Sequence, residues 1–392
     1  MLELYDLDRA MTTAGQGSGD WREGFLRRFG PGVLCGITLR DWSKLVWRER
    51  GQIEAPYLPR VCAITFQSLK TSLIGFLENK RYGPRFQNVT IQPPLFVLGH
   101  WRNGTTHLHQ LISRDPRFAF PNTYQVSFPN TFLTTEAVDS RLISYFMPRR
   151  RPMDNVELSL SSPQEDEFAL CATCLKSPFM ACVFPRQKHR FERYLTFSTA
   201  APGELAEWQE ALMRFVKKVQ WRYGRPLVLK SPPHTARIRL LLDLFPNARF
   251  VHIHRNPYRV FQSSRRLFLT MFAWHGLQRP VLEDLDEWIL RQYREMYETF
   301  FSQRELVPAG RFHEMSFEQL EQDPIGEVHK LYEALHLPDF SSFEPELRRY
   351  TDSLAGYRKN SFAGLPAELQ ARISKEWERC FEEWGYPVSE VV

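Results

Sequence analysis

The stretch FVLGHWRNGTTHLHQLI, residues 96–112, joins a short apolar run to a glycine-bounded loop and then to a helical pattern. Gly99 and Gly104 have the G-x-x-x-x-G spacing of a phosphate-binding loop, in which backbone amides surround an anion at the start of a helix. A nucleotide triphosphatase would place Lys and then Ser or Thr next. Here Thr105 stands in the lysine position and Thr106 follows, while Arg102 lies inside the loop. The sequence therefore predicts an anion-binding loop of a different kind.

Strand and helix signals alternate on both sides of this loop. Buried strands are predicted at LFVLG (95–99) and PLVLK (226–230), and two further strands at RFVHIHR (249–255) and within GRFHEMSFEQL (310–320). Helical patterns lie between and after them, at about 105–113, 165–175, 203–222, 235–245, 282–306 and 325–337, with one more beginning at Pro257. Such alternation predicts an α/β, P-loop-like three-layer fold with a mainly parallel sheet flanked by helices.

A helical region precedes the first strand. We predict a helical N-terminal extension packed on the core at 1–93 and the main domain at 94–392. Within the extension, VCAITFQSLKTSLIGFLEN (61–79) has an apolar face with a period near 3.6. Its residues are Val61, Ile64, Phe66, Leu69, Leu73, Ile74 and Leu77. We expect this face to pack on the chain's own domain, although a face of this kind could also rest on a bilayer surface.

Composition narrows the class of protein. A net charge of +6 over 392 residues suits a small anionic ligand better than a nucleic acid. No apolar run approaches the roughly 18 residues of a membrane span, and the N-terminus has no apolar signal core, so we expect a soluble, cytoplasmic protein. The six irregularly spaced cysteines do not describe a disulfide framework. Cys171 and Cys174 would share one helix face, where core packing is expected rather than metal binding.

Cationic groups follow the predicted strands. Lys230 ends the second strand and Arg255 follows the third, and the carboxyl ends of parallel strands are where such sheets bind ligands. A magnesium-dependent kinase or nucleotide triphosphatase would place an acid at the end of a later strand. Neither strand end supplies one. The sequence therefore predicts a site that neutralises a nucleotide with side chains and amides and requires no metal.

Three motifs together resemble one family. WRNGTTHLHQLI, LKSPPH (229–234) and FPNARFVHIHRNPYRVFQSS (245–264) are similar to sulfotransferases that use 3′-phosphoadenosine 5′-phosphosulfate (PAPS), particularly the bacterial branch with R-x-G-T-T. The likeness runs from about residue 95 to 338. It implies the sulfotransferase fold, transfer of a sulfuryl group to a hydroxyl, and adenosine 3′,5′-bisphosphate (PAP) as the product.

The resemblance also implies binding residues. The family's loop for the 5′-phosphosulfate falls here on Arg102, Asn103, Gly104, Thr105 and Thr106. Its 3′-phosphate site, an arginine followed eight positions later by a serine, falls on Arg255 and Ser263. A late basic loop completes that site in the family. GYRKN (356–360), with Arg358 and Lys359, is the candidate here, although it departs from the longer glycine-containing form.

The catalytic assignments follow from charge and proton transfer. Arg102 and Lys230 are placed to stabilise charge on the oxygen that leaves with the nucleotide. A base must accept the acceptor's proton, and we favour Glu167 or Glu165 over His234. The two glutamates would lie about 200° apart on a helix, so that only one could serve. His234 follows a strand, as a histidine does in the cytosolic enzymes, but two extra residues intervene.

The acceptor and two other classes of function stay open. The aromatic residues of RRLFLTMFAWHGLQ (265–278) could line a pocket for an apolar acceptor, although core packing is favoured for any one of them. A small molecule, a lipid or a glycan would each offer a hydroxyl. The alternatives are a kinase with a degenerate loop and a non-catalytic nucleotide-binding protein. We expect no nucleic-acid partner, and the sequence leaves the oligomeric state and a peripheral membrane contact open.

Overall fold

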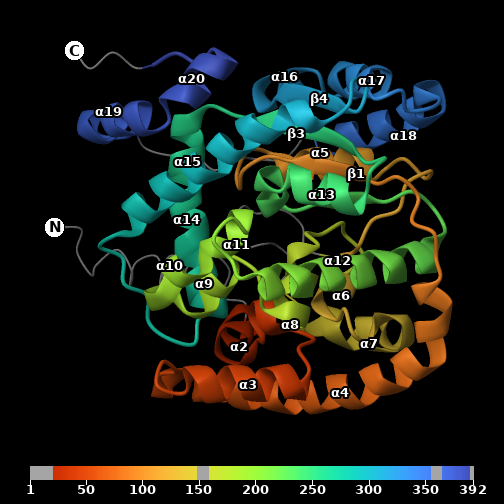
Figure 1. Ribbon diagram of the computed structural model, residues 1–392, viewed down its shortest axis with the longest axis vertical. Helices are drawn as coiled ribbons and strands as arrows, with labels where there is room; N and C mark the ends of the chain where they lie inside the picture. Colours follow the sequence, from red (N-terminus) through yellow and green to blue (C-terminus); the bar gives the residue numbers. More distant parts are fainter. Residues whose placement is uncertain (1–20, 148–158, 355–363, 389–392) are drawn as a thin grey trace. The chain divides into compact units, whose positions relative to one another are not determined.

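The computed structural model describes residues 21–147, 159–354 and 364–388 (Figure 1). The chain divides into two compact units, each assembled from separate stretches. The first is drawn from Met1–Thr90, Pro121–Tyr223 and Arg266–Leu285, and the second from Ile91–Phe120, Gly224–Arg265 and Asp286–Val392. Helix α14 (Pro257–His275) begins in the second unit and ends in the first.

The second unit holds the sheet. Its strands are β1 (Leu95–Leu98), β2 (Val228–Lys230), β3 (Arg249–His254) and β4 (Phe312–Ser316). All pairs are parallel and the order is β2-β1-β3-β4, so the four predicted strands and the parallel sheet are confirmed. The chain passes from β1 to one side and later crosses to the other. The loop after β1 therefore lies where the strand order reverses, which is the usual ligand position in such sheets.

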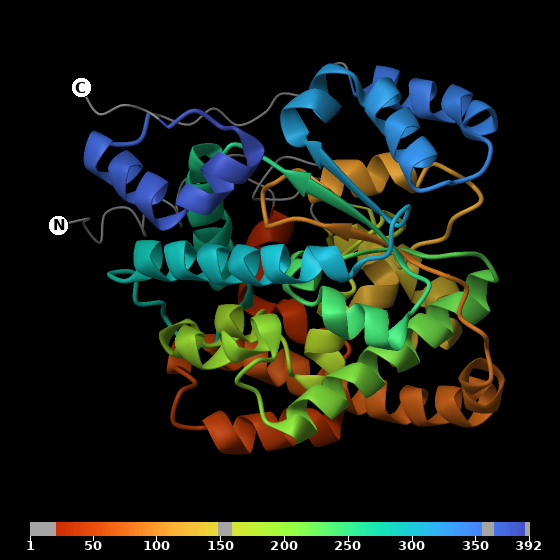
Figure 2. The same cartoon turned by 45° about the horizontal axis from the view of Figure 1, so that its top comes forward.

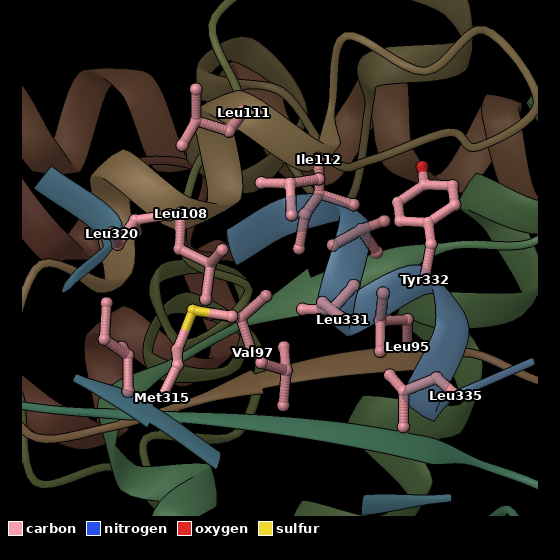
Figure 3. Packing of buried hydrophobic residues seen from close by; sticks show 14 of the residues in the cluster. Leu95, Val97, Leu108, Leu111, Ile112, Met315, Leu320, Leu331, Tyr332 and Leu335 are labelled. Atoms are coloured by element: carbon pink, nitrogen blue, oxygen red, sulfur yellow. The ribbon is translucent and has the colours of Figure 1, made fainter. Parts of the chain in front are cut away.

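Helices cover both faces of this sheet (Figure 2). The helices of the second unit are α5 (Thr105–Ile112), η4 (Pro232–Ala236), α13 (Ile238–Leu244), α15 (Leu285–Gln303), η5 (Arg304–Leu306), α16 (Phe317–Gln322), α17 (Pro324–Ala334), α18 (Phe340–Ser353), α19 (Ala367–Glu376) and α20 (Glu378–Trp384). Side chains alternate along β1. Val97 packs with Leu108 of α5 and Met315 of β4 (Figure 3), whereas Phe96 turns to the other face and stacks on Phe250.

The first unit is helical. Its elements are α2 (Trp21–Phe29), η1 (Gly32–Leu34), α3 (Leu39–Glu49), η2 (Ala55–Tyr57), α4 (Leu58–Gln87), α6 (Thr123–Ser127), α7 (Phe132–Phe146), α8 (Glu167–Cys174), α9 (Met180–Val183), η3 (Pro185–Gln187), α10 (Lys188–Phe191), α11 (Arg193–Thr196) and α12 (Pro202–Tyr223). The apolar residues Trp208, Leu212, Phe215, Val216 and Val219 of α12 are all buried. No helix in the described ranges is long and apolar enough to cross a membrane.

One prediction for this unit is wrong. The apolar face of 61–79 was expected to pack inward, but Phe66, Leu69, Leu73 and Leu77 are all exposed on α4, and Ile64 alone of the seven is fully buried. The period of 3.6 grouped Phe66, Leu69, Leu73 and Leu77 correctly on one face, whereas Ile64 lies on the buried side of the helix. The period could not say which side of the helix the rest of the unit would cover.

Candidate functional site

The loop between β1 and α5 adopts a backbone that requires its glycines. Gly99 has φ +141° and Gly104 has φ +94°, which L-residues rarely adopt. A Cβ atom at Gly104 would lie 2.2 Å from Cδ2 of Phe317, and one at Gly99 would lie 2.6 Å from the Ile253 carbonyl oxygen. Arg102 also lies in the left-handed region, with φ +77°. The two glycines let the loop approach β3 and α16 closely.

Hydrogen bonds to other residues of the second unit hold the loop in this shape. The Gly99 amide donates to Thr235 Oγ1 at 2.7 Å, and the His100 amide donates to the Tyr297 hydroxyl at 3.1 Å. Asn103 is fully buried, and its amide group donates to the Ile253 carbonyl at 3.1 Å and to the Tyr297 hydroxyl at 2.7 Å. Asn103 is one of the residues predicted to bind the nucleotide, and its side chain fixes the shape of the loop through these two bonds.

Two arginines from different strand ends meet beside the loop. Arg102 Nε donates to Ser263 Oγ at 2.7 Å, and Arg255 Nη1 donates to the Arg102 carbonyl at 3.1 Å. The guanidinium carbon of Arg255 lies 4.2 Å from the centre of the Phe317 ring. Burial, the largest influence, lowers the pKa of Arg255 from its ordinary value, and the positive charge of Arg102 acts in the same direction. An anion bound here would relieve that crowding of positive charge.

A third cation lies at the end of β2. Lys230 is buried, and its Nζ donates to Thr106 Oγ1 at 3.3 Å in the first turn of α5. Gly104 is the N-terminal cap of that helix, so the amides of Thr105 and Thr106 lie at its positive end. Parallel pairing sets Lys230 opposite Val97, two residues before Gly99. The second unit thus gathers the predicted Arg102, Arg255, Ser263, Lys230 and Thr106 around one loop.

The candidate bases belong to different units. His234 lies in η4 of the second unit, is fully buried, and packs its ring edge-on against Phe96 at 5.4 Å. Glu165 and Glu167 belong to the first unit and are both buried. Helix α8 begins at Glu167, so Glu165 precedes it. The argument that helical geometry separates the two glutamates by 200° is therefore wrong.

The remaining predicted residues are two cations late in the chain and two cysteines of α8. Arg358 and Lys359 lie outside the described residues. Cys171 is fully buried in α8, where burial raises its pKa well above the ordinary value, and Cys174 donates to the Leu170 carbonyl at 3.1 Å. Within the described ranges, no group of three or more His, Cys, Asp or Glu side chains could hold a metal ion.

Three residues that shape this site were missed in the sequence. Thr235 and Tyr297 support the loop, and Phe317 lies between Gly104 and Arg255. Phe317 had a usable signal, because it lies in the segment predicted to contain the fourth strand, and strand ends converge in parallel sheets. The sequence gives no such signal for Tyr297, because it lies in the middle of α15, at a position typical of an apolar helix face.

Comparison with known proteins defines the class. Residues 93–342 match the sequence model of the Sulfotransferase family, and the chain belongs to this family. It is a transferase that moves a sulfuryl group.

The similar proteins include several mycobacterial sulfotransferases. The chain is 36% identical over 367 residues to omega-hydroxy-beta-dihydromenaquinone-9 sulfotransferase Stf3 of Mycobacterium bovis and of Mycobacterium tuberculosis, covering 93% of both chains. Its fold is like that of sulfotransferase STF9 from Mycobacterium avium (TM-score 0.68, 20% identity, 98% of this chain and 97% of that one). It is also like that of sulfotransferase STF1 from Mycobacterium tuberculosis H37Rv (TM-score 0.60, 17% identity, 86% and 91%).

Proposed function

We propose that this sulfotransferase takes its sulfuryl group from PAPS and transfers it to a hydroxyl of an apolar, lipid-like acceptor without a metal. The observation that carries the choice of PAPS is the grouping of Arg102, Arg255 and Lys230 around the Gly99–Gly104 loop. Two separate anionic groups, a 5′-phosphosulfate and a 3′-phosphate, need cations at two positions, and this cluster offers both.

Each residue has a separate task in this proposal. The amides of Gly104, Thr105 and Thr106 bind the 5′-phosphosulfate at the positive end of α5. Arg255 and Ser263 bind the 3′-phosphate, and Arg358 and Lys359 complete its binding. Asn103 acts through the loop, because its side chain is bonded to Ile253 and Tyr297.

PAPS carries a sulfuryl group bonded to an oxygen of its 5′-phosphate, and the rest of the nucleotide is the leaving group. In the proposed step, the acceptor oxygen attacks sulfur in line as the sulfur–oxygen bond to the 5′-phosphate breaks. PAP leaves with that bonding pair, and a base takes the hydroxyl proton. Lys230 and Arg102 stabilise the charge that develops on the departing oxygen, which is a task for preorganised cations.

We propose Glu167 or Glu165 as the base, ahead of His234. His234 is the weaker candidate because two extra residues separate it from the strand end at which the cytosolic enzymes have their histidine. Glu167→Gln, Glu165→Gln and His234→Gln, made one at a time, separate the three. Loss of the base should lower kcat by about 10²-fold or more while the Kd for PAP changes little. Near-native kcat in all three variants would remove every one of these assignments.

The acceptor class rests on the relative that sulfates a hydroxylated menaquinone. The chain shares 36% identity with it over nearly the full length of both proteins. We therefore propose a hydroxylated isoprenoid quinone, or a lipid of similar shape, as the acceptor. Sulfation assays with PAPS should show turnover of such a lipid and little turnover of a water-soluble sugar. The reverse preference would refute this assignment.

The choice of sulfuryl donor has an independent test. Thermal unfolding is followed with PAP and with ATP plus magnesium, each with and without EDTA. Stabilisation by PAP that EDTA leaves unchanged supports the proposal. A response confined to ATP with magnesium would indicate a kinase-like site. PAP binding without sulfuryl transfer to any acceptor tested would favour a nucleotide-binding protein that has lost catalysis.

A further inference from the structure

Helix α4 is amphipathic in the opposite sense to an ordinary surface helix. Its buried residues are mostly polar: Arg60, Ile64, Ser68, Thr71, Glu78, Gly83 and Phe86. Its exposed large hydrophobic residues are Leu58, Phe66, Leu69, Leu73, Phe76 and Leu77, with exposed fractions from 50% to 77%. A surface helix normally buries its apolar stripe and exposes its polar one. This inversion needs a physical cause and an occupant for the exposed stripe.

The cause is that the polar side of α4 is bonded inside the first unit. Arg60 Nη1 donates to the Gly276 carbonyl at 2.6 Å. Glu78 is paired with the buried Lys218 at 2.6 Å and accepts from the Thr134 amide at 2.8 Å. These contacts stabilise the inward orientation of the polar side, and separating Glu78 from Lys218 would leave a buried charge without its partner, which is strongly destabilising. The helix therefore cannot roll to hide its apolar stripe without breaking these contacts.

The exposed stripe continues onto two neighbouring helices, which pack against α4 near the bottom of Figure 1. Lys70 Nζ of α4 donates to Asp139 of α7 at 2.6 Å, and the Trp21 ring of α2 lies 6.2 Å from that of Tyr145 of α7. We call the exposed large hydrophobic residues of the three helices the outer face. They are Trp21, Phe25 and Phe29 of α2, the six of α4 named above, and Val138, Leu142 and Tyr145 of α7. Proteins that stay monomeric in water rarely expose so many large apolar side chains together.

The charged residues around the outer face indicate which kind of surface covers it. Every exposed charged residue of α2, α4 and α7 is basic: Arg28, Lys70, Lys80, Arg81, Arg85 and Arg141. The acidic residues of these helices are half-buried or buried. An apolar face with aromatic residues and a basic border is typical of a surface that lies in the interface of an anionic membrane.

We propose that the outer face docks this enzyme onto the surface of a bilayer that contains anionic lipids, with α4 lying in the plane of the headgroups. A second copy of the chain is a poorer occupant. A two-fold pair would set one basic border against another, which is unfavourable. The docking rests on these residues alone. If the proposed lipid acceptor is correct, docking would bring the enzyme to the membrane in which that acceptor is dissolved.

Vesicle flotation with the full chain tests the docking. We expect binding to phosphatidylcholine vesicles that contain phosphatidylglycerol, weaker binding to phosphatidylcholine alone, and release as NaCl is raised. Leu73→Glu combined with Phe76→Glu should weaken binding at least about tenfold, since it replaces two apolar contacts with charges that the lipid repels. Val281→Glu is the matched control, an exposed apolar residue of the same unit that lies on none of the three helices.

The depth to which α4 enters the bilayer gives a second readout of docking. Cys62 is exposed on α4, whereas the other described cysteines are half-buried or buried, so it can carry an environment-sensitive fluorophore. Brominated acyl chains should quench that fluorophore in bound protein. Stabilisation by PAP, measured on every variant, shows that the site in the second unit is intact and keeps this test separate from the reaction. Equal flotation of the double variant and wild type would overturn the proposal. A protein that forms a dimer through the outer face and does not bind vesicles would also overturn the proposal.

Discussion

Gly104→Ala should weaken PAP binding and lower thermal stability, because the residue sits against an aromatic ring in a left-handed backbone. The added Cβ would lie 2.2 Å from Cδ2 and 2.8 Å from Cε2 of Phe317. No Cβ tolerates a carbon that close, so the ring or the loop must move. The guanidinium of Arg255 rests 4.2 Å from the centre of the same ring. Movement on either side would therefore disturb the proposed nucleotide site.

The magnitude follows from two contributions. Overpacking costs about 1–3 kcal/mol. A non-glycine residue at φ +94° adds about 1–3 kcal/mol of backbone strain. If half of the combined cost is expressed as displacement of the loop, the Kd for PAP should rise about 5- to 150-fold, since 1.4 kcal/mol corresponds to a factor of ten.

Isothermal titration with PAP and thermal unfolding together measure the effect. Gly224→Ala is the matched control, because Gly224 also has positive φ, at +65°, but no atom lies within 4 Å of its Cβ position. Phe317→Ala combined with Gly104→Ala should recover part of the stability lost in the single variant. If Gly104→Ala behaved like Gly224→Ala in both measurements, the close packing of loop and ring would not matter, and the reasoning would fail.

Changes at three further residues test the nucleotide site and the stability of the fold at the end of β3. Lys230→Ala should lower kcat by about 10²-fold or more with a smaller effect on the Kd for PAP, since its proposed role is in the transition state; equal losses in both would refute that role. Arg255→Ala should raise the Kd for PAP at least about tenfold and Arg255→Lys by less, as titration at fixed salt would show. Burial lowers the pKa of His254 to about 4, from about 6.5 in the unfolded chain. Between those values the unfolded chain binds more protons, so the free energy of unfolding should fall as pH drops through this window, and His254→Gln should flatten that slope.

Much of the sheet and of the site follows from local sequence. Strands β1, β2 and β3 contain short apolar runs, β4 mixes apolar residues with His313 and Glu314, and all four strands lie where they were predicted. Arg255 and Ser263 were predicted from their spacing of eight residues, and in the structure each is hydrogen-bonded to Arg102. Lys230 reaches the loop because the carboxyl ends of parallel strands share one edge.

The tertiary structure decided which polar groups those elements would meet. Asn103 has the sequence position of a binding residue, but Tyr297, 194 residues later, engages its side chain. The period of α4 marked out an apolar face, whereas Arg60 and Glu78 fixed that face outward through Gly276 and Lys218, which lie far along the chain. Sequence periodicity reports only how side chains are distributed around a helix. The side that is buried depends on hydrogen bonds and ion pairs with distant partners, because an unpaired buried charge costs more than an exposed leucine gains by burial.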